Sequence, residues 1–248
     1  MTAVGPGSLD ARVARMAKAL AGARPRPRVA GLAADNGVDW VVADLAAERA
    51  GVVLVPLPAF FTAGQLEHVV AASGMDSVLG ARLAGFEAVG ELEGLRWSHR
   101  PCETPELPRG TSKLTFTSGT TGAPKGVALR SAQQWAVARS IAGVARALAL
   151  RRHLCLLPLS VLLENVGGVY AALAAEMQFC VPSLAEVGMR GSSSFDADAC
   201  LAAIEHWQAE SVILLPQMLA ALASAVERGA VAPRSLKFAA VGGARVSP

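Results

Sequence analysis

Charged side chains are scarce in this sequence. Asp, Glu, Lys and Arg make up 17% of its 248 residues, aromatic residues 5%, and hydrophobic residues 52%. A chain this apolar has enough material for a buried core, so the composition excludes an intrinsically disordered protein. The formal net charge is only +3. The one local basic cluster, Arg24, Arg26 and Arg28, alternates with prolines and is typical of a solvated linker, so we expect no nucleic-acid partner.

Metal-binding and disulfide patterns are also missing. The four cysteines have wide, irregular spacing without a C-x-x-C pair, which is typical of reduced thiols in a cytoplasmic protein. His153 and Cys155 could place two ligands on one strand face, but ordinary packing explains them as well. The N-terminus has no uninterrupted apolar segment, and the apolar run Leu154–Val181 is broken by polar residues. We therefore expect neither a secretory signal nor a membrane span.

Strand and helix patterns alternate along the chain, which predicts an α/β fold. A helix is expected to begin after Thr62, where Gln65 completes a capping box, and to end at Gly74. Residues 1–27 are expected to form a flexible segment and residues 28–248 a folded domain, with a possible subdomain boundary near 100–112. The proline-rich stretch Gly80–Gly110 is predicted to be an irregular connection.

The segment Leu114–Arg130, LTFTSGTTGAPKGVALR, carries the clearest chemical signal. Glycines allow close approach of the backbone to a ligand, and consecutive N–H groups form an anion-binding concavity. Hydroxyls and one lysine add donors suited to phosphate. The sequence therefore predicts a polyphosphate-binding loop, with the following candidate residues: Thr117, Ser118, Gly119, Thr120, Thr121, Gly122 and Lys125.

This loop differs from the common nucleotide-binding motifs. G-x-x-x-x-G-K-[ST] and G-x-G-x-x-G are both absent, and Phe116 occupies the position where a nucleophile elbow requires glycine. Pro124 disfavours a helical Ala123, so Lys125–Leu129 should be a return strand and the loop a connection between two strands. For composition alone, a Ser/Thr/Gly surface turn remains the alternative.

The string T-S-G-T-T-G-A-P-K-G-V resembles the phosphate loop of the AMP-forming adenylating enzymes, which include acyl-CoA synthetases, peptide-synthetase adenylation domains and luciferases. Similar segments flank it: Val38–Thr62 upstream, LLPLSVLLEN downstream, and LKFAAVGGARVSP at the end. The resemblance spans about residue 28 to Pro248. It implies the N-terminal domain of such an enzyme, with β-sheets flanked by helices.

The resemblance also implies ATP-dependent activation of a carboxylic acid to acyl-AMP. ATP and Mg²⁺ would be the cofactors, with CoA or a carrier-protein thiol as the acceptor. Lys125 and Thr120 would act on the phosphates, Thr121 would contact Mg²⁺, and Gly242, Gly243 and Ala244 would line the adenine. The P-L-P-A-F-F-T and L-P-L segments favour a fatty or aryl acid over an amino acid.

Several departures from the family pattern affect this expectation. Val161 stands where relatives usually carry a histidine that lines the acyl pocket, and the Glu-Arg pair becomes Glu164–Asn165. The downstream family motifs are missing, so the chain resembles the first half of such an enzyme. We expect the 248 residues alone to be inactive and to self-associate. A catalytically inactive nucleotide- or partner-binding fragment remains the alternative.

Overall fold

The computed structural model describes residues 6–103, 105–117, 124–190 and 194–243. The chain divides into two compact units, which we call unit 1 and unit 2. Of the described residues, those within 6–34 and 38–133 belong to unit 2, and those within 35–37 and 134–243 belong to unit 1. The contacts place the main division of the chain near residue 133, and the possible subdomain boundary near 100–112 stays a prediction.

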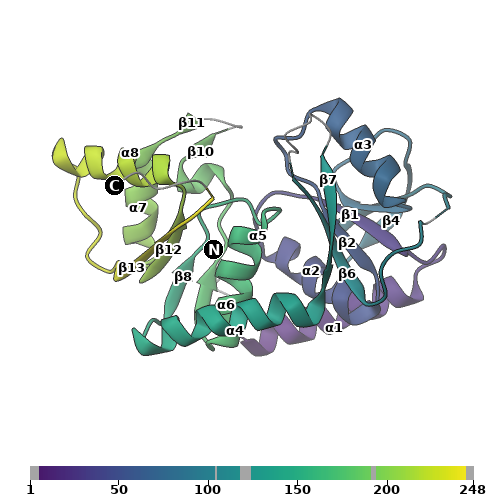
Figure 1. Ribbon diagram of the computed structural model, residues 1–248, viewed down its shortest axis with the longest axis horizontal. Helices are drawn as coiled ribbons and strands as arrows, with labels where there is room; N and C mark the ends of the chain where they lie inside the picture. The colour runs from purple at the N-terminus through teal and green to yellow at the C-terminus, as the bar shows by residue number, and fades with distance from the viewer. Residues whose placement is uncertain (1–5, 104, 118–123, 191–193, 244–248) are drawn as a thin grey trace. The chain divides into compact units, whose positions relative to one another are not determined.

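Unit 2 contains a seven-stranded mixed sheet in the order β4-β5-β3-β1-β2-β6-β7 (Figure 1). Strands β1, β2, β3 and β6 pair in parallel, and β5, β4 and β7 are added antiparallel at the two sides. The strands are β1 (Val29–Ala33), β2 (Val53–Pro56), β3 (Ser77–Gly80), β4 (Glu87–Leu92), β5 (Leu95–His99), β6 (Thr111–Thr117) and β7 (Lys125–Arg130). The helices are α1 (Pro6–Gly22), α2 (Val38–Ala50) and α3 (Ala63–Ser73).

Helix α3 follows the sequence prediction in detail. Thr62 accepts from the Gln65 backbone N–H, Gln65 accepts from the Thr62 N–H, and the capping box is complete. Gly74 ends the helix at φ 59°, a left-handed conformation that glycine adopts without steric cost. Local sequence chemistry is sufficient to determine both ends of this helix.

Two expectations in this half of the chain were wrong. Residues 6–22, expected to be flexible, form α1, which packs on α2 through Leu9, Val13, Met16 and Leu20. Their spacing of four, three and four residues places them on one helical face. The stretch expected to be irregular contains the β4–β5 hairpin. Its two-residue turn, Glu93–Gly94, has positive φ at both positions, as a type I′ turn requires.

Unit 1 is built on a four-stranded parallel sheet in the order β13-β12-β8-β9. Helices α7 and α8 cover one face with a dense aliphatic core, and α4 with the segment α5–η1–α6 lies on the other (Figure 1). The strands are β8 (Arg152–Leu154), β9 (Gln178–Cys180), β12 (Ser211–Leu214) and β13 (Phe238–Val241), with a small β10 (Met189–Arg190) and β11 (Ser194–Phe195) hairpin. The helices are α4 (Ser131–Ala147), α5 (Leu162–Glu164), η1 (Asn165–Tyr170), α6 (Ala171–Ala174), η2 (Ala185–Val187), α7 (Ala197–His206) and α8 (Pro216–Glu227).

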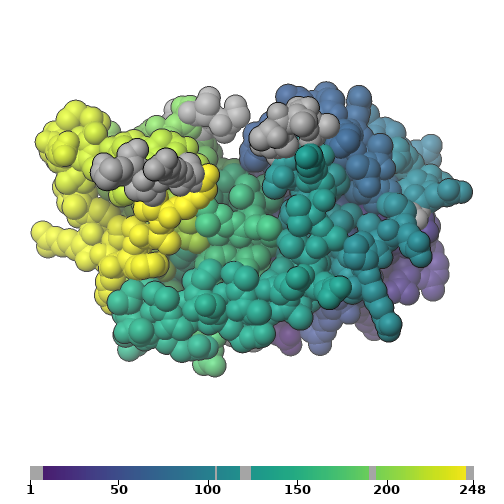
Figure 2. Space-filling view, viewed as in Figure 1, coloured from purple at the N-terminus to yellow at the C-terminus, as the bar shows by residue number. Residues whose placement is uncertain are grey.

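The helical segment from Leu162 to Ala174 is interrupted. Residues 165–170 form a π-helical turn between the short helices α5 and α6. π-Helical turns often occur at functional sites. Tyr170, at the end of this turn, stacks on Trp135 of α4 with ring centroids 4.6 Å apart. Val137 and Val144 of α4 are exposed, as is Leu148 just after its end, and Figure 2 shows the helix running along the visible surface. None of the described helices is long and apolar enough to cross a bilayer.

All four cysteines lie in described segments, and none forms a disulfide. Burial raises the pKa of the Cys155 and Cys180 thiols and raises that of Cys200 to about 12. Since the thiolate is the reactive form, these three should react slowly. We expect a thiol reagent at pH 8 to label the half-buried Cys102 first. Mass mapping of the labelled peptides checks this, and rapid labelling of Cys155 in the native protein would contradict the described burial.

Candidate functional site: the phosphate-loop hairpin and the pocket of unit 1

The hairpin β6–β7 holds the predicted phosphate loop at its end. The two strands are antiparallel, with Thr117 opposite Lys125, so the predicted return strand is confirmed. Residues 118–123 lie outside the described residues, and with them the candidates Ser118, Gly119, Thr120, Thr121 and Gly122. The described part of the loop region is therefore its two ends.

Both ends present groups suited to an anion. Thr117 and Lys125 are exposed, and among the described residues no carboxylate forms an ion pair with Lys125. The lysine charge is thus available to a ligand. Close packing accounts for the glycine at position 126, because a Cβ there would lie 3.1 Å from the Phe116 ring.

A contact that the sequence did not suggest holds the second end of the loop. The His68 imidazole Nε2 lies 2.9 Å from the carbonyl oxygen of Pro124, so its N–H donates to that oxygen in the fitting tautomer. Pro124 is buried, and His68 belongs to α3. Their separation of 56 positions in the sequence explains why no local pattern revealed the contact.

The second predicted nucleotide contact is the turn after β13. Gly243 has φ 82°, and a Cβ at this position would lie 2.7 Å from Leu215 Cδ2. At Gly242 a Cβ would lie 3.3 Å from Leu163 Cδ1. Both glycines therefore allow the turn to pack directly on leucine side chains of unit 1. Ala244, the third predicted adenine contact, lies outside the described residues.

Glu164 is the centre of a buried polar network in unit 1. Its Oε2 accepts from the backbone N–H groups of Leu156 and Leu157, at 3.1 and 2.8 Å, and its Oε1 accepts from His153 Nε2 at 2.9 Å. His153 Nδ1 lies 3.1 Å from Ser211 Oγ. With the proton on Nε2, Nδ1 accepts from the Ser211 hydroxyl. The carboxylate side chain is fully buried, so Glu164, which precedes the departure at Asn165, is a structural anchor in this chain.

The same network bears on whether His153 and Cys155 are metal ligands or ordinary core residues. Both lie near Glu164, and one potential ligand atom from each of the three residues falls within 4.8 Å of the others. Burial, and then the Glu164 charge, raise the pKa of the Cys155 thiol well above its ordinary value. A protonated thiol and a carboxylate with three donors form a satisfied hydrogen-bonded core. Hydrogen bonding within the core therefore explains these three residues better than a metal site does.

Asn36 fixes the chain that follows β8. Its Nδ2 donates to the Leu157 carbonyl oxygen at 2.9 Å, and its Oδ1 accepts from the Leu159 N–H at 2.8 Å. The side chain is buried, and more than 120 residues separate it from its partners. Asn36 and Glu164 together thus hold both ends of residues 156–159, the L-L-P-L stretch. Sequence reasoning missed Asn36 because an Asp-Asn-Gly run normally indicates only a turn.

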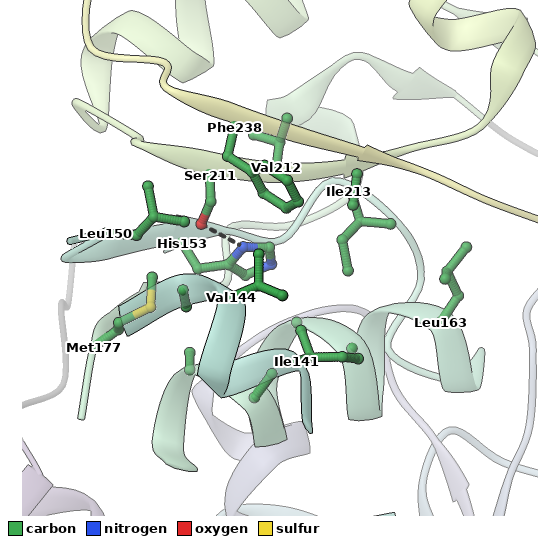
Figure 3. A pocket seen from close by; sticks show the side chains of 16 residues that line it. Ile141, Val144, Leu150, His153, Leu163, Met177, Ser211, Val212, Ile213 and Phe238 are labelled. Carbon is green, nitrogen blue, oxygen red and sulfur yellow. Dashed lines mark hydrogen bonds between the residues drawn. The ribbon is translucent and has the colours of Figure 1, made fainter. Parts of the chain in front are cut away.

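An apolar pocket of about 250 Å³ lies between α4, the η1–α6 segment and the sheet (Figure 3). Ile141 and Val144 of α4, Leu163, and Ile213 and Phe238 of the sheet point into it from different sides. Its two polar side chains, His153 and Ser211, bond to each other. The pocket wall is therefore hydrocarbon over nearly all of its surface.

Comparison with known proteins identifies the family. The sequence pattern of the AMP-binding enzymes matches residues 7–248. Over 137 residues the chain is 36% identical to phosphinothricin tripeptide synthetase PhsC of Streptomyces viridochromogenes, covering 46% of this chain and 12% of that protein. The chain thus spans a small part of this curated relative.

Solved structures show the same fold. Bacillus subtilis o-succinylbenzoate CoA synthetase (MenE), in complex with the acyl-adenylate intermediate OSB-AMP, has a TM-score of 0.72 at 22% identity, over 96% of this chain and 62% of MenE. The MenE complex with ATP and magnesium gives 0.69 at 20% identity, over 98% and 64%. With the family pattern extending over nearly the whole sequence, the chain belongs to the AMP-binding enzyme family.

Proposed function

We propose that this chain carries the ATP-binding part of an enzyme that activates a carboxylic acid as acyl-AMP. Membership of the AMP-binding family supports this, as does the fold shared with MenE, whose solved complexes include an acyl-adenylate and ATP with magnesium. The observation that carries the proposal is the string from Thr117 to Val127, whose two ends belong to the antiparallel strands β6 and β7.

The proposed reaction needs no protein nucleophile. A carboxylate oxygen attacks the α-phosphorus of ATP, a new O–P bond forms, and the bond to the bridging oxygen breaks to release pyrophosphate. Negative charge on the phosphates must be stabilised by oriented donors and cations. An exposed lysine and threonine facing each other across the hairpin fit a polyphosphate.

Within this proposal the loop residues have distinct roles. Lys125 and Thr120 would bind the phosphates, and Thr121 would help to hold Mg²⁺. A bound Mg²⁺ would supply charge neutralisation of the phosphates. The remaining donors from the loop would orient the ATP, and they are Thr117, Ser118, Gly119 and Gly122. At the turn after β13, Gly242, Gly243 and Ala244 would lie against the adenine.

The substrate is proposed to be a fatty or aryl acid, and the acceptor a thiol of CoA or of a carrier protein. The pocket of unit 1 supports an apolar acid, because its wall has almost no polar surface. Leu163 connects the two regions: it lines the pocket and also packs under Gly242.

The test of the proposal is nucleotide binding at Lys125. We expect Lys125→Ala to weaken Mg·ATP binding by about tenfold to a hundredfold, since a charge-assisted hydrogen bond is worth about 1.5–3 kcal/mol. Titration calorimetry with Mg·ATP on the 248-residue chain measures this. Lys18→Ala is the matched control, because Lys18 is an exposed lysine of α1 in the same unit. Equal ATP affinity of the two variants would refute the role of Lys125.

A further inference from the structure

We infer that the pocket of unit 1 selects acids with an unfunctionalised hydrocarbon tail of about eight carbons, and that Gly167 sets the depth available to that tail. This inference rests on the proposed function and narrows its substrate class. It depends on three properties of the pocket: its hidden polar atoms, its volume and its connection to the glycine turn.

The pocket has two polar side chains in its wall but offers almost no polar surface. His153 is held between Glu164 and Ser211, at 2.9 and 3.1 Å, and the Ser211 hydroxyl also lies 3.4 Å from the Arg152 carbonyl oxygen. Each of these polar atoms thus has a partner inside the protein. A hydroxyl or carboxylate at the far end of a substrate would lose its water and find no partner, which is costly.

The volume sets the size of the tail. An engineered cavity of about 150 Å³ in another protein accommodates benzene, and this pocket measures about 250 Å³. With roughly 30 Å³ for each water-sized group, it holds about eight methylene-sized groups. A medium-length alkyl chain fits, whereas an acetyl or butyryl group would leave most of the pocket unfilled.

The direction of the tail follows from Leu163. This side chain lies under Gly242 at one end of the pocket, whereas Leu150 and Met177 lie at the other (Figure 3). A carboxylate activated beside the glycine turn would therefore direct its tail past Leu163. The described residues that line the pocket beyond it are apolar, apart from the paired His153 and Ser211.

Gly167 is the position where a side chain would shorten this space. It lines the pocket, and a Cβ there would lie 3.3 Å from Ile213 Cδ1 and 3.9 Å from Ile141 Cδ1, both flexible side-chain ends. The neighbouring Gly168 differs, because a Cβ there would lie 2.2 Å from Glu164 Oε1. Gly167→Val therefore fills the pocket and leaves the Glu164 network intact.

The experiment compares binding of octanoate, butyrate and 8-hydroxyoctanoate to the 248-residue chain by calorimetry, with Mg·ATP binding measured on the same sample. Each buried methylene is worth roughly fourfold in affinity. We expect octanoate to bind on the order of a hundredfold more tightly than butyrate, and 8-hydroxyoctanoate at least tenfold more weakly than octanoate. Gly167→Val should weaken octanoate binding at least tenfold and leave ATP and butyrate binding unchanged.

Gly143→Val is the matched control, since Gly143 is exposed on α4 and a Cβ there has no neighbour within 4 Å. If Gly167→Val does not fold, Val144→Trp narrows the pocket from its exposed rim and should give the same loss. The inference would be overturned if the chain binds ATP but binds octanoate no more tightly than butyrate. Equal octanoate affinity of Gly167→Val and Gly143→Val would also overturn it. Octanoate selectivity without ATP binding would support the pocket and refute the proposed function.

Discussion

Replacing Glu164 by alanine is expected to lower the free energy of unfolding of unit 1 by about 3–5 kcal/mol, the usual cost of removing one partner of a buried pair. Three donors would lose their acceptor: His153 Nε2 and the N–H groups of Leu156 and Leu157. The carboxylate is fully buried, so water does not replace it. Since the free energy of unfolding of a domain is only about 5–15 kcal/mol, this loss would remove a large part of the stability of unit 1.

Urea unfolding followed by circular dichroism measures the effect. Glu227→Ala, an exposed glutamate at the end of α8 in the same unit, should stay within about 0.5 kcal/mol of the original protein. Glu164→Gln should fall between the two, because its amide oxygen can still accept from the Leu156 and Leu157 N–H groups. If Glu164→Ala unfolds at the same urea concentration as Glu227→Ala, the network does not stabilise the unit as described.

A comparable loss is expected in unit 2 from Asp44→Ala. Lys113 Nζ lies 2.8 and 3.1 Å from the two carboxylate oxygens of Asp44, and both side chains are at most 2% exposed. Alanine at position 44 leaves a buried ammonium without its counter-charge, which costs about 3–5 kcal/mol. Lys113 belongs to β6, the strand that ends at the proposed phosphate loop, so ATP binding should weaken together with stability.

The double variant Asp44→Leu with Lys113→Met tests the mechanism. Replacing both charges by apolar groups of similar size removes the unpaired charge, so the double variant should be more stable than Asp44→Ala alone. Urea unfolding of the double variant and of Asp44→Leu and Lys113→Met singly completes a double-mutant cycle. The cycle gives the interaction free energy between the two side chains. Strictly additive losses would show that the two residues contribute independently.

Some features of this protein follow from the sequence alone because their causes are local. The capping box Thr62–Gln65 and the left-handed Gly74 determine α3 within a dozen residues. The α/β pattern and the return strand after Pro124 likewise depend on neighbouring residues, and the string from Thr117 to Val127 identified the family. The prolines near the β4–β5 hairpin led to the prediction of an irregular connection over Gly80–Gly110, and that prediction was wrong.

The pocket and the network of unit 1 were decided only by the tertiary structure. The pocket walls come from α4, the interrupted helix and the three parallel strands β8, β12 and β13, and His153 meets Ser211 across 58 residues. Asn36 reaches Leu157 across 121 residues. No sequence spacing records such contacts, because parallel strands bring together residues whose separation depends on the whole crossover between them. Hence the sequence alone predicted the proposed phosphate loop and its flanking strands, whereas the tertiary structure determined the shape of the apolar pocket.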